Sequence, residues 1–224
     1  MRFLCSLVLS MLIFFTPVVS KAVEIVNTQP TRSALSTAPG VDFDWTLKSG
    51  TDAQWLASKF SLDKDYFLTD LHGWLYNDGS DTGDNFSITI YGDGGEVPDT
   101  ANLLYSNGGS ISGIDGQYNW EGFQIAAGSW GPGLELSLGD YWIAFELRTS
   151  NYANPYAGTM ADGAALPLTD GAFDVGSGWT AYDDLSLGVR IQGVEAAPVP
   201  EPSTFLLLGA GLGGLALYRR KAKK

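Results

Sequence analysis

The segment from Asn77 to Asn85 contains the residues best suited to bind a metal ion. Its sequence, NDGSDTGDN, places a carboxylate at every third position, at Asp78, Asp81 and Asp84. Calcium binds about six to eight oxygen atoms, and glycines let a loop fold around the ion. The spacing differs from that of an EF-hand loop, so two interpretations stay open. The segment is either a weak structural calcium site or a solvated hairpin loop rich in turn-forming residues.

Aromatic side chains in turn-rich segments form a second candidate site. The four residues concerned lie in GSWGPG, GSGWTAY and NYANPY, and they are Trp130, Trp179, Tyr152 and Tyr156. Flat aromatic faces stack on sugar rings, so these residues predict a weak carbohydrate-binding site. Burial in the core is the alternative role for an aromatic side chain, and we expect it for Trp45 and Trp120, which lie in alternating segments.

Catalytic groups are scarce in this sequence. His72 is the only histidine, which excludes a multi-histidine zinc site, and no Gly-x-Ser-x-Gly elbow is present. We therefore expect a structural role for His72. Phosphate-loop and dinucleotide fingerprints are absent as well.

Glycoside hydrolysis would need only two carboxylates, about 5 to 9.5 Å apart. Glu121, Glu135 and Glu146 lie in or near predicted strands, but the Glu-x-Asp-x-x-Glu pattern of jelly-roll glucanases does not occur. Carboxylates on the solvent face of a strand are the commoner case. We predict that the protein is not an enzyme, with a secreted two-carboxylate glycosidase as the alternative.

Alternation of apolar and polar residues predicts the elements that would position these groups. VDFDWTLK and NFSITIYG alternate, and Leu185, Leu187, Val189 and Ile191 alternate in the last such segment. ELSLGDYWIAFEL predicts a hairpin that turns at Gly139-Asp140, with Tyr141, Ile143, Phe145 and Leu147 on one face. Only the segment from Gln54 to Leu62 is compatible with a short helix. Half-buried antiparallel strands produce this alternation, so we predict an all-β fold, an antiparallel β-sandwich or jelly-roll-like domain.

The charge of the body limits its partners. Between residues 23 and 200, six lysines and arginines face 24 carboxylates, which gives a net charge of 6 − 24 = −18. So negative a field argues against nucleic acid and anionic membranes as partners. The only cysteine, Cys5, lies in the N-terminal apolar segment. Once that segment is removed, neither disulfides nor thiol chemistry can occur.

The N-terminal segment has the layout of a secretory signal peptide. One cation, Arg2, precedes an apolar run from Phe3 to Val19, and Ser20-Lys21-Ala22 supplies the small residues of a cleavage site. We place the cut after Ala22, with the bond after Ser20 as second choice. A retained anchor helix is the alternative.

The C-terminus has three parts in a fixed order. Val199, Pro200, Glu201 and Pro202 form a rigid motif, because the prolines fix φ and disfavour helix. Fourteen uncharged residues follow, 205–218, which would make a helix of about 21 Å against a hydrocarbon core of roughly 30 Å. The tail then ends in a basic cluster, Arg219, Arg220, Lys221, Lys223 and Lys224, which such a topology keeps in the cytoplasm.

This arrangement resembles the PEP-CTERM sorting signal of Gram-negative bacteria. The resemblance implies processing by an exosortase, a multi-pass membrane enzyme, near Pro200-Glu201-Pro202. It also implies an organism that makes exopolysaccharide, and delivery to the envelope or the extracellular matrix. A plain stop-transfer helix is the alternative interpretation of the apolar stretch.

The body also resembles the uncharacterised β-sandwich domains found ahead of such anchors. The similarity rests on Asp70 to Trp74, Phe86-x-Ile88-x-Ile90-Tyr91, Gly139 to Trp142, Trp179 and the strand from Leu185 to Gly193. It implies a fold and no activity.

Five segments follow from these observations. They are a signal peptide (1–22), a β-sandwich domain (23–195), a Pro-rich linker with the Pro-Glu-Pro motif (196–204), a transmembrane sorting helix (205–218) and a basic cytoplasmic tail (219–224). We expect an exported protein, exosortase-sorted and transiently anchored in the membrane, with a structural or adhesive role in an exopolysaccharide-rich envelope. A carbohydrate-binding module and a glycosidase are the alternatives. No cofactor is expected beyond structural calcium.

Overall fold

The computed structural model describes most of the body and six residues of the tail. The described residues are 21–30, 44–49, 53–77, 85–127, 133–147, 156–161, 164–166, 168, 170–182, 185–196, 209, 211, 212, 215, 218 and 219. All named elements of the body are strands, and every strand pair is antiparallel. The prediction of an all-β, antiparallel fold is therefore confirmed.

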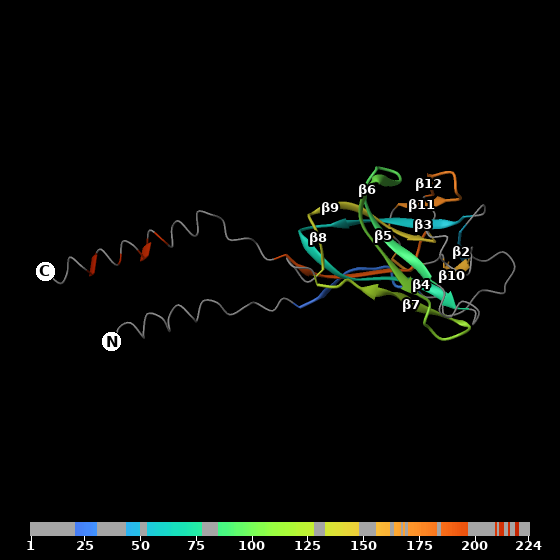
Figure 1. The fold of residues 1–224 in the computed structure, drawn as a ribbon, viewed down its shortest axis with the longest axis horizontal. Coiled ribbons are helices and arrows are strands. Elements are labelled where there is room, and N and C mark those ends of the chain that lie inside the picture. Colours follow the sequence, from blue (N-terminus) through green and yellow to red (C-terminus); the bar gives the residue numbers. More distant parts are fainter. Residues whose placement is uncertain are drawn as a thin grey trace.

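The strands form two sheets, which Figure 1 shows as an upper and a lower layer. The seven-stranded sheet contains β1 (Val23–Asn27), β2 (Asp44–Lys48), β4 (Tyr66–Asn77), β7 (Gln117–Gln124), β8 (Leu134–Leu136), β10 (Tyr156–Ala161) and β13 (Val189–Glu195). The six-stranded sheet contains β3 (Trp55–Leu62), β5 (Asn85–Asp93), β6 (Pro98–Ser110), β9 (Gly139–Glu146), β11 (Gly171–Asp174) and β12 (Trp179–Ala181).

One hydrophobic core joins the two sheets. Leu71 and Leu75 of β4 contribute from the seven-stranded sheet, and Ile88 of β5 and Phe145 of β9 contribute from the other. All four side chains have no solvent-exposed surface. The alternating residues predicted at the end of the body, from Leu185 to Ile191, are buried in this core as well. Two sheets that share a core in this way have the arrangement of a β-sandwich.

The segment compatible with a helix, Gln54 to Leu62, is instead the strand β3, so that prediction was wrong. Leu56 and Phe60 face the main core, while Ala57 lies in a second hydrophobic cluster on the opposite side of the sheet. A strand that is buried on both faces loses the simple alternation that identifies a strand. The spacing of four residues between Leu56 and Phe60 therefore also fitted a helix.

The predicted hairpin at Gly139-Asp140 does not form. Strand β8 pairs with β4 in the seven-stranded sheet, whereas β9 pairs with β3 and β5 in the six-stranded sheet. The short link between β8 and β9 therefore carries the chain from one sheet to the other. Tyr141, Ile143, Phe145 and Leu147 do share the core-facing side, as the alternation predicted.

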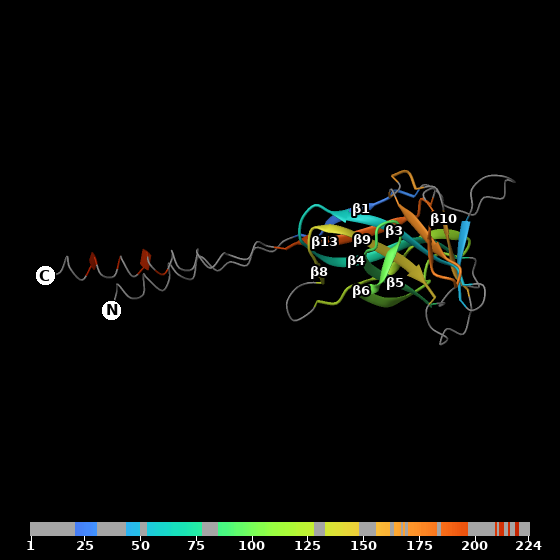
Figure 2. The same cartoon turned by 90° about the horizontal axis from the view of Figure 1, so that it is seen from above.

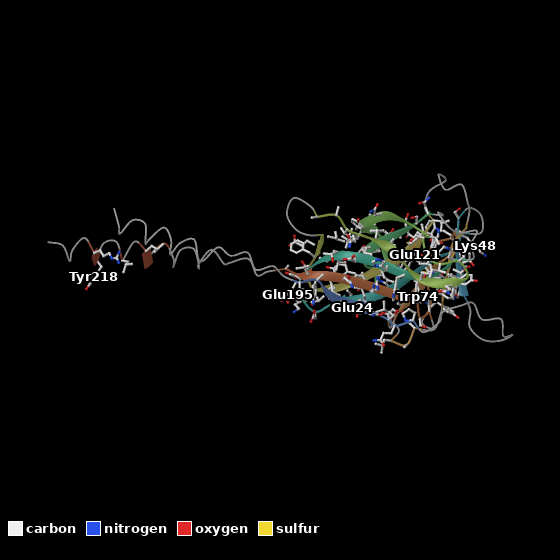
Figure 3. The ribbon with its side chains drawn as sticks, turned by 90° about the horizontal axis from the view of Figure 1, so that it is seen from below. Glu24, Lys48, Trp74, Glu121, Glu195 and Tyr218 are labelled. Atoms are coloured by element: carbon white, nitrogen blue, oxygen red, sulfur yellow. The ribbon has the colours of Figure 1, made fainter. Side chains whose placement is uncertain are left out.

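The described body begins and ends at the same end of the seven-stranded sheet. Val23, the first residue of β1, pairs with Gly193 near the end of β13, and Figure 2 shows the two strands together. Glu24 and Glu195 are labelled at this end in Figure 3. The first and last strands of the described body therefore lie side by side at this end.

The tail is described at only six positions. Gly209, Gly211, Leu212, Leu215, Tyr218 and Arg219 are helical. Within the described residues, the structure contains no helix long and apolar enough to cross a membrane. Most of the segment 205–218 lies outside those residues, so the sorting helix stays a prediction, as does the signal peptide.

Candidate functional site

The outer face of the seven-stranded sheet collects aromatic side chains on its central strand. In β4, Leu71, Gly73 and Leu75 face the core, so Trp74 and Tyr76 face outward. A register shift beside Asp70 displaces the alternation by one residue there, as a β-bulge does. The bulge places Leu68 and Leu71, three residues apart, on the same inner face.

Strand β7 adds a second row of aromatics. Trp120 pairs directly with Trp74, and Tyr118 pairs with Tyr76. The rings of Trp74 and Trp120 meet edge to face, with 5.0 Å between their centroids. The ring of Tyr118 stacks parallel to that of Trp74 at a centroid distance of 6.5 Å and lies 5.3 Å, centroid to centroid, from the ring of Tyr76. We call these four residues the aromatic platform. Tyr118 is buried, whereas the other three side chains are partly exposed. Figure 3 views the molecule from this side, with Trp74 labelled.

A cation lies against the platform from the neighbouring strand. The Arg190 guanidinium of β13 sits over the ring of Trp120, 4.7 Å from its centroid, which is a cation–π contact. The guanidinium of Arg190 makes no hydrogen bond or ion pair with any residue that the structure describes, and its Nε is buried without a partner. This is unusual in a body so rich in carboxylates, since arginine carries five donors and no acceptor.

His72 lies beside Arg190, with which it pairs across β4 and β13. Burial lowers the pKa of His72 below its usual value, and the positive charge of Arg190 lowers it further. The imidazole is therefore neutral at pH 7. The structural role expected for His72 stays a prediction.

The outer face of the six-stranded sheet holds a buried carboxyl group, Glu146. It has no exposed surface and accepts hydrogen bonds from the Tyr91 hydroxyl (2.8 Å) and the Thr89 hydroxyl (3.0 Å). Burial raises the pKa of Glu146, the Thr89 hydrogen bond lowers it, and the negative charge of Asp174 raises it, so that the resulting pKa is about 8. Glu146 is therefore mostly protonated at neutral pH.

The neighbours of Glu146 form a small second core. Tyr91, Trp142 and three alanines are fully buried there, with Trp179 packed against them. Asp174 accepts hydrogen bonds from the backbone N–H groups of Gly176 (2.7 Å) and Gly178 (3.0 Å). A general acid must reach its substrate, but Glu146 has no exposed surface in this conformation. The arrangement is that of a buried structural network.

The other two candidate carboxylates lie elsewhere. Glu121 of β7 is buried and accepts hydrogen bonds from the backbone N–H groups of Ser112 (3.0 Å) and Gly113 (2.6 Å), so it holds the chain before β7 in place. Glu135 of β8 is exposed. Both belong to the seven-stranded sheet, so the structure does not bring the three glutamates together.

Few of the residues predicted to bind ligands can be placed. Trp179 begins β12 and is half-buried, and the backbone of Tyr156 begins β10. Arg219 is helical. The other predicted site residues lie outside the described part, namely Trp130, Tyr152, Asp78, Asp81, Asp84, Val199, Pro200, Glu201, Pro202, Arg220, Lys221, Lys223 and Lys224. The described residues contain no group of three metal-binding side chains.

The platform was missed in the sequence because Trp120 was assigned to the core. Trp45 does pack against the main core, but Trp120 lies on the outer face, so that prediction was wrong. A usable signal was present. HGWLY and YNW each place aromatic residues two apart, which puts them on one face of a strand, opposite the face that carries Leu71 and Leu75.

Residues 198–221 match the family model of the PEP-CTERM protein-sorting motif. The C-terminus therefore carries a PEP-CTERM sorting motif, as the three-part tail predicted. The motif implies export through the membrane, sorting to the cell envelope and processing by an exosortase. Comparison with curated proteins finds no significant match.

Proposed function

We propose that this protein is exported to the cell surface or the extracellular matrix, where it has a structural or adhesive role in an exopolysaccharide-rich envelope. The observation that carries the proposal is the sorting motif at residues 198–221, which follows an acidic all-β body. The helix 205–218 anchors the chain briefly in the inner membrane, with the basic cluster in the cytoplasm. An exosortase then cuts near the Pro-Glu-Pro motif.

The geometry of the body supports this role. Because β1 begins and β13 ends at one end of the sheet, the chain can leave the membrane at that end and present the rest of the body outward. The Pro-rich linker would act as a semi-rigid spacer. The high negative charge of the body keeps it soluble and disfavours binding to anionic lipid. We propose that the body acts by binding and not by catalysis, in keeping with the buried position of Glu146.

The mass of the mature protein tests the sorting step. In membrane and culture fractions of the native host, we expect a product that begins near Val23 and ends near Pro202. Glu201→Gln removes the only acid of the motif and should leave the tail uncut. Glu195→Gln makes the same chemical change at an exposed residue of β13, outside the matched segment, and should be processed normally. A wild-type product that retains Lys224 and occurs only in the membrane would reduce the tail to a simple anchor.

We also propose that the segment of Asp78, Asp81 and Asp84 binds structural calcium. It joins β4 to β5, the central strand of one sheet to a strand of the other, so an ion bound there would stabilise the folded body by mass action. Millimolar calcium should raise the melting temperature of the wild-type protein, and Asp81→Asn should reduce that rise. Magnesium at the same concentration is the control, because it requires near-ideal octahedral geometry and gives up its waters reluctantly. Equal melting temperatures with and without calcium would remove the site.

A further inference from the structure

We propose that the aromatic platform, together with Arg190 and His72, binds an uncharged polysaccharide chain. The inference rests on the proposed function, because it names the ligand through which the protein would adhere to its matrix. The residues come from three adjacent strands, β7, β4 and β13. They differ from the aromatics that the sequence singled out.

The platform offers aromatic surface where the core does not need it. Trp74 and Trp120 lie on the outer face of the sheet, outside both hydrophobic clusters, and remain partly exposed. Two tryptophan rings that do not fill the core are costly to leave in water. A pyranose ring presents a face of C–H groups, which pack against the electron-rich face of an aromatic ring.

The length of the surface suits a chain and not a single sugar. Asp70, His72, Trp74 and Tyr76 follow one another on the outer face of β4. At about 3.3 Å per residue, the six steps from Asp70 to Tyr76 span roughly 20 Å. Aromatic residues occupy one half of this row of outward-facing residues, and polar residues occupy the other half. In the polar half, Asp70 pairs with Gln124 of β7 and with Gln192 of β13.

Arg190 supplies the polar contact at the boundary between the two halves. Its guanidinium lies against the ring of Trp120, and none of the described residues accepts a hydrogen bond from that guanidinium. Its donors therefore suit the oxygens of a ligand, and sugar hydroxyls are acceptors of this kind. Apolar faces with a few fixed polar groups are typical of sites for small molecules and sugars.

The charge of the body favours an uncharged chain. A net charge of −18 repels a polyanion over distances of about a Debye length, roughly 8 to 10 Å in physiological salt. A carboxylate-bearing polysaccharide could pair with Arg190 but would be repelled by the negative charge of the rest of the body. A neutral glycan is not repelled.

Close packing at Gly188 and Gly122 fixes the backbone that carries the platform. A Cβ added to Gly188 would lie 2.3 Å from the Cβ of Trp74, and one added to Gly122 would lie 2.0 Å from the Leu71 carbonyl oxygen. Neither position can carry a side chain without displacing β4. The rings of Trp74 and Trp120 are thus held by backbone that cannot shift easily, which lowers the entropy lost when a ligand binds.

Affinity electrophoresis of the mature secreted protein tests the inference. Native gels contain hydroxyethylcellulose or galactomannan as neutral probes and alginate as the anionic probe. We expect retardation in a neutral gel, and an apparent Kd for Trp120→Ala at least about tenfold weaker, equal to about 1.4 kcal/mol. Arg190→Gln should weaken binding as well. Trp179→Ala, on the outer face of the other sheet, is the matched control and should bind like the wild type.

Four outcomes would overturn the inference. They are no retardation of the wild type in either neutral gel, retardation only in alginate, equal binding by wild type and Trp120→Ala, and loss of binding in Trp179→Ala alone. Circular dichroism and a thermal melt establish that each variant is folded. If Trp120→Ala does not fold, acrylamide quenching of wild-type tryptophan fluorescence replaces it, with protection by the neutral probe as the expected result and unchanged quenching as the contrary one. Processing of the tail is measured separately by mass, so a failure here leaves the sorting proposal standing.

Discussion

Glu146→Gln is expected to make the protein more stable at alkaline pH and to leave its stability at about pH 4 nearly unchanged. In the folded state, burial raises the pKa of Glu146 to about 8, from an ordinary value of 4.5. Between these two values the folded chain keeps a proton that the unfolded chain releases. The free energy of unfolding therefore falls as the pH rises from about 4.5 to about 8, and the loss is then complete.

The size of this effect follows from the difference between the pKa values of Glu146 in the folded and unfolded states. Each unit of that difference corresponds to about 1.4 kcal/mol, so the free energy of unfolding of the wild-type protein should fall by several kcal/mol between about pH 4.5 and pH 8. Glutamine carries no charge at any pH, which removes the dependence. For a domain of this length, each kcal/mol corresponds to roughly 2–4 °C in melting temperature. Melting curves at intervals from about pH 4 to pH 9 measure the difference directly.

Glu135→Gln is the matched control, because Glu135 is exposed on β8. It should leave the pH dependence of the melting temperature as in the wild type. Glu146→Leu should be less stable than Glu146→Gln at every pH, since it removes the acceptor of the Tyr91 and Thr89 hydrogen bonds, and a buried group that loses its partner is destabilising. Parallel pH curves for wild type and Glu146→Gln would show that Glu146 is not buried in the neutral form.

The sequence placed Glu146 in a strand but could not predict its burial. Ile143 and Phe145 face the core as the alternation predicted, so Glu146 was expected on a solvent face. In the structure that outer face is covered too, and Trp142, on the same face of β9, has no exposed surface. Alternation identifies one buried face of a strand. Whether the other face is covered depends on segments distant in sequence.

The same limit explains which features of the fold were predicted. The three-part tail is a local pattern, and the match to residues 198–221 confirms it. The antiparallel β fold also follows from local alternation. The partner of each strand is a long-range property, so β8 and β9 appeared to form a hairpin although they belong to different sheets. The platform depends on the pairing of β4 with β7, which β5 and β6 separate in the chain, so alternation within either strand does not show which residues pair.

Gly73→Ala tests how tightly the two sheets approach each other, and we expect it to destabilise the protein by about 1–3 kcal/mol. Gly73 lies on the inner face of β4, where an added Cβ would come 2.5 Å from Cε1 of Phe145 and 2.8 Å from Cδ1 of Leu75. Both neighbours are fully buried, so neither ring nor methyl group can move without disturbing the core. Urea or thermal unfolding of the variant measures the loss.

A second substitution separates this clash from any general effect of alanine in the strand. Phe145→Leu removes the ring atoms that an alanine at position 73 would meet. The double variant Gly73→Ala with Phe145→Leu should therefore lose less stability than the sum of the two single changes, because the residues are in contact and couple. Phe86→Leu shortens another fully buried phenylalanine of the same core and should simply add to Gly73→Ala. If both pairs proved additive, the sheets would be separated more widely at Gly73 than this packing implies.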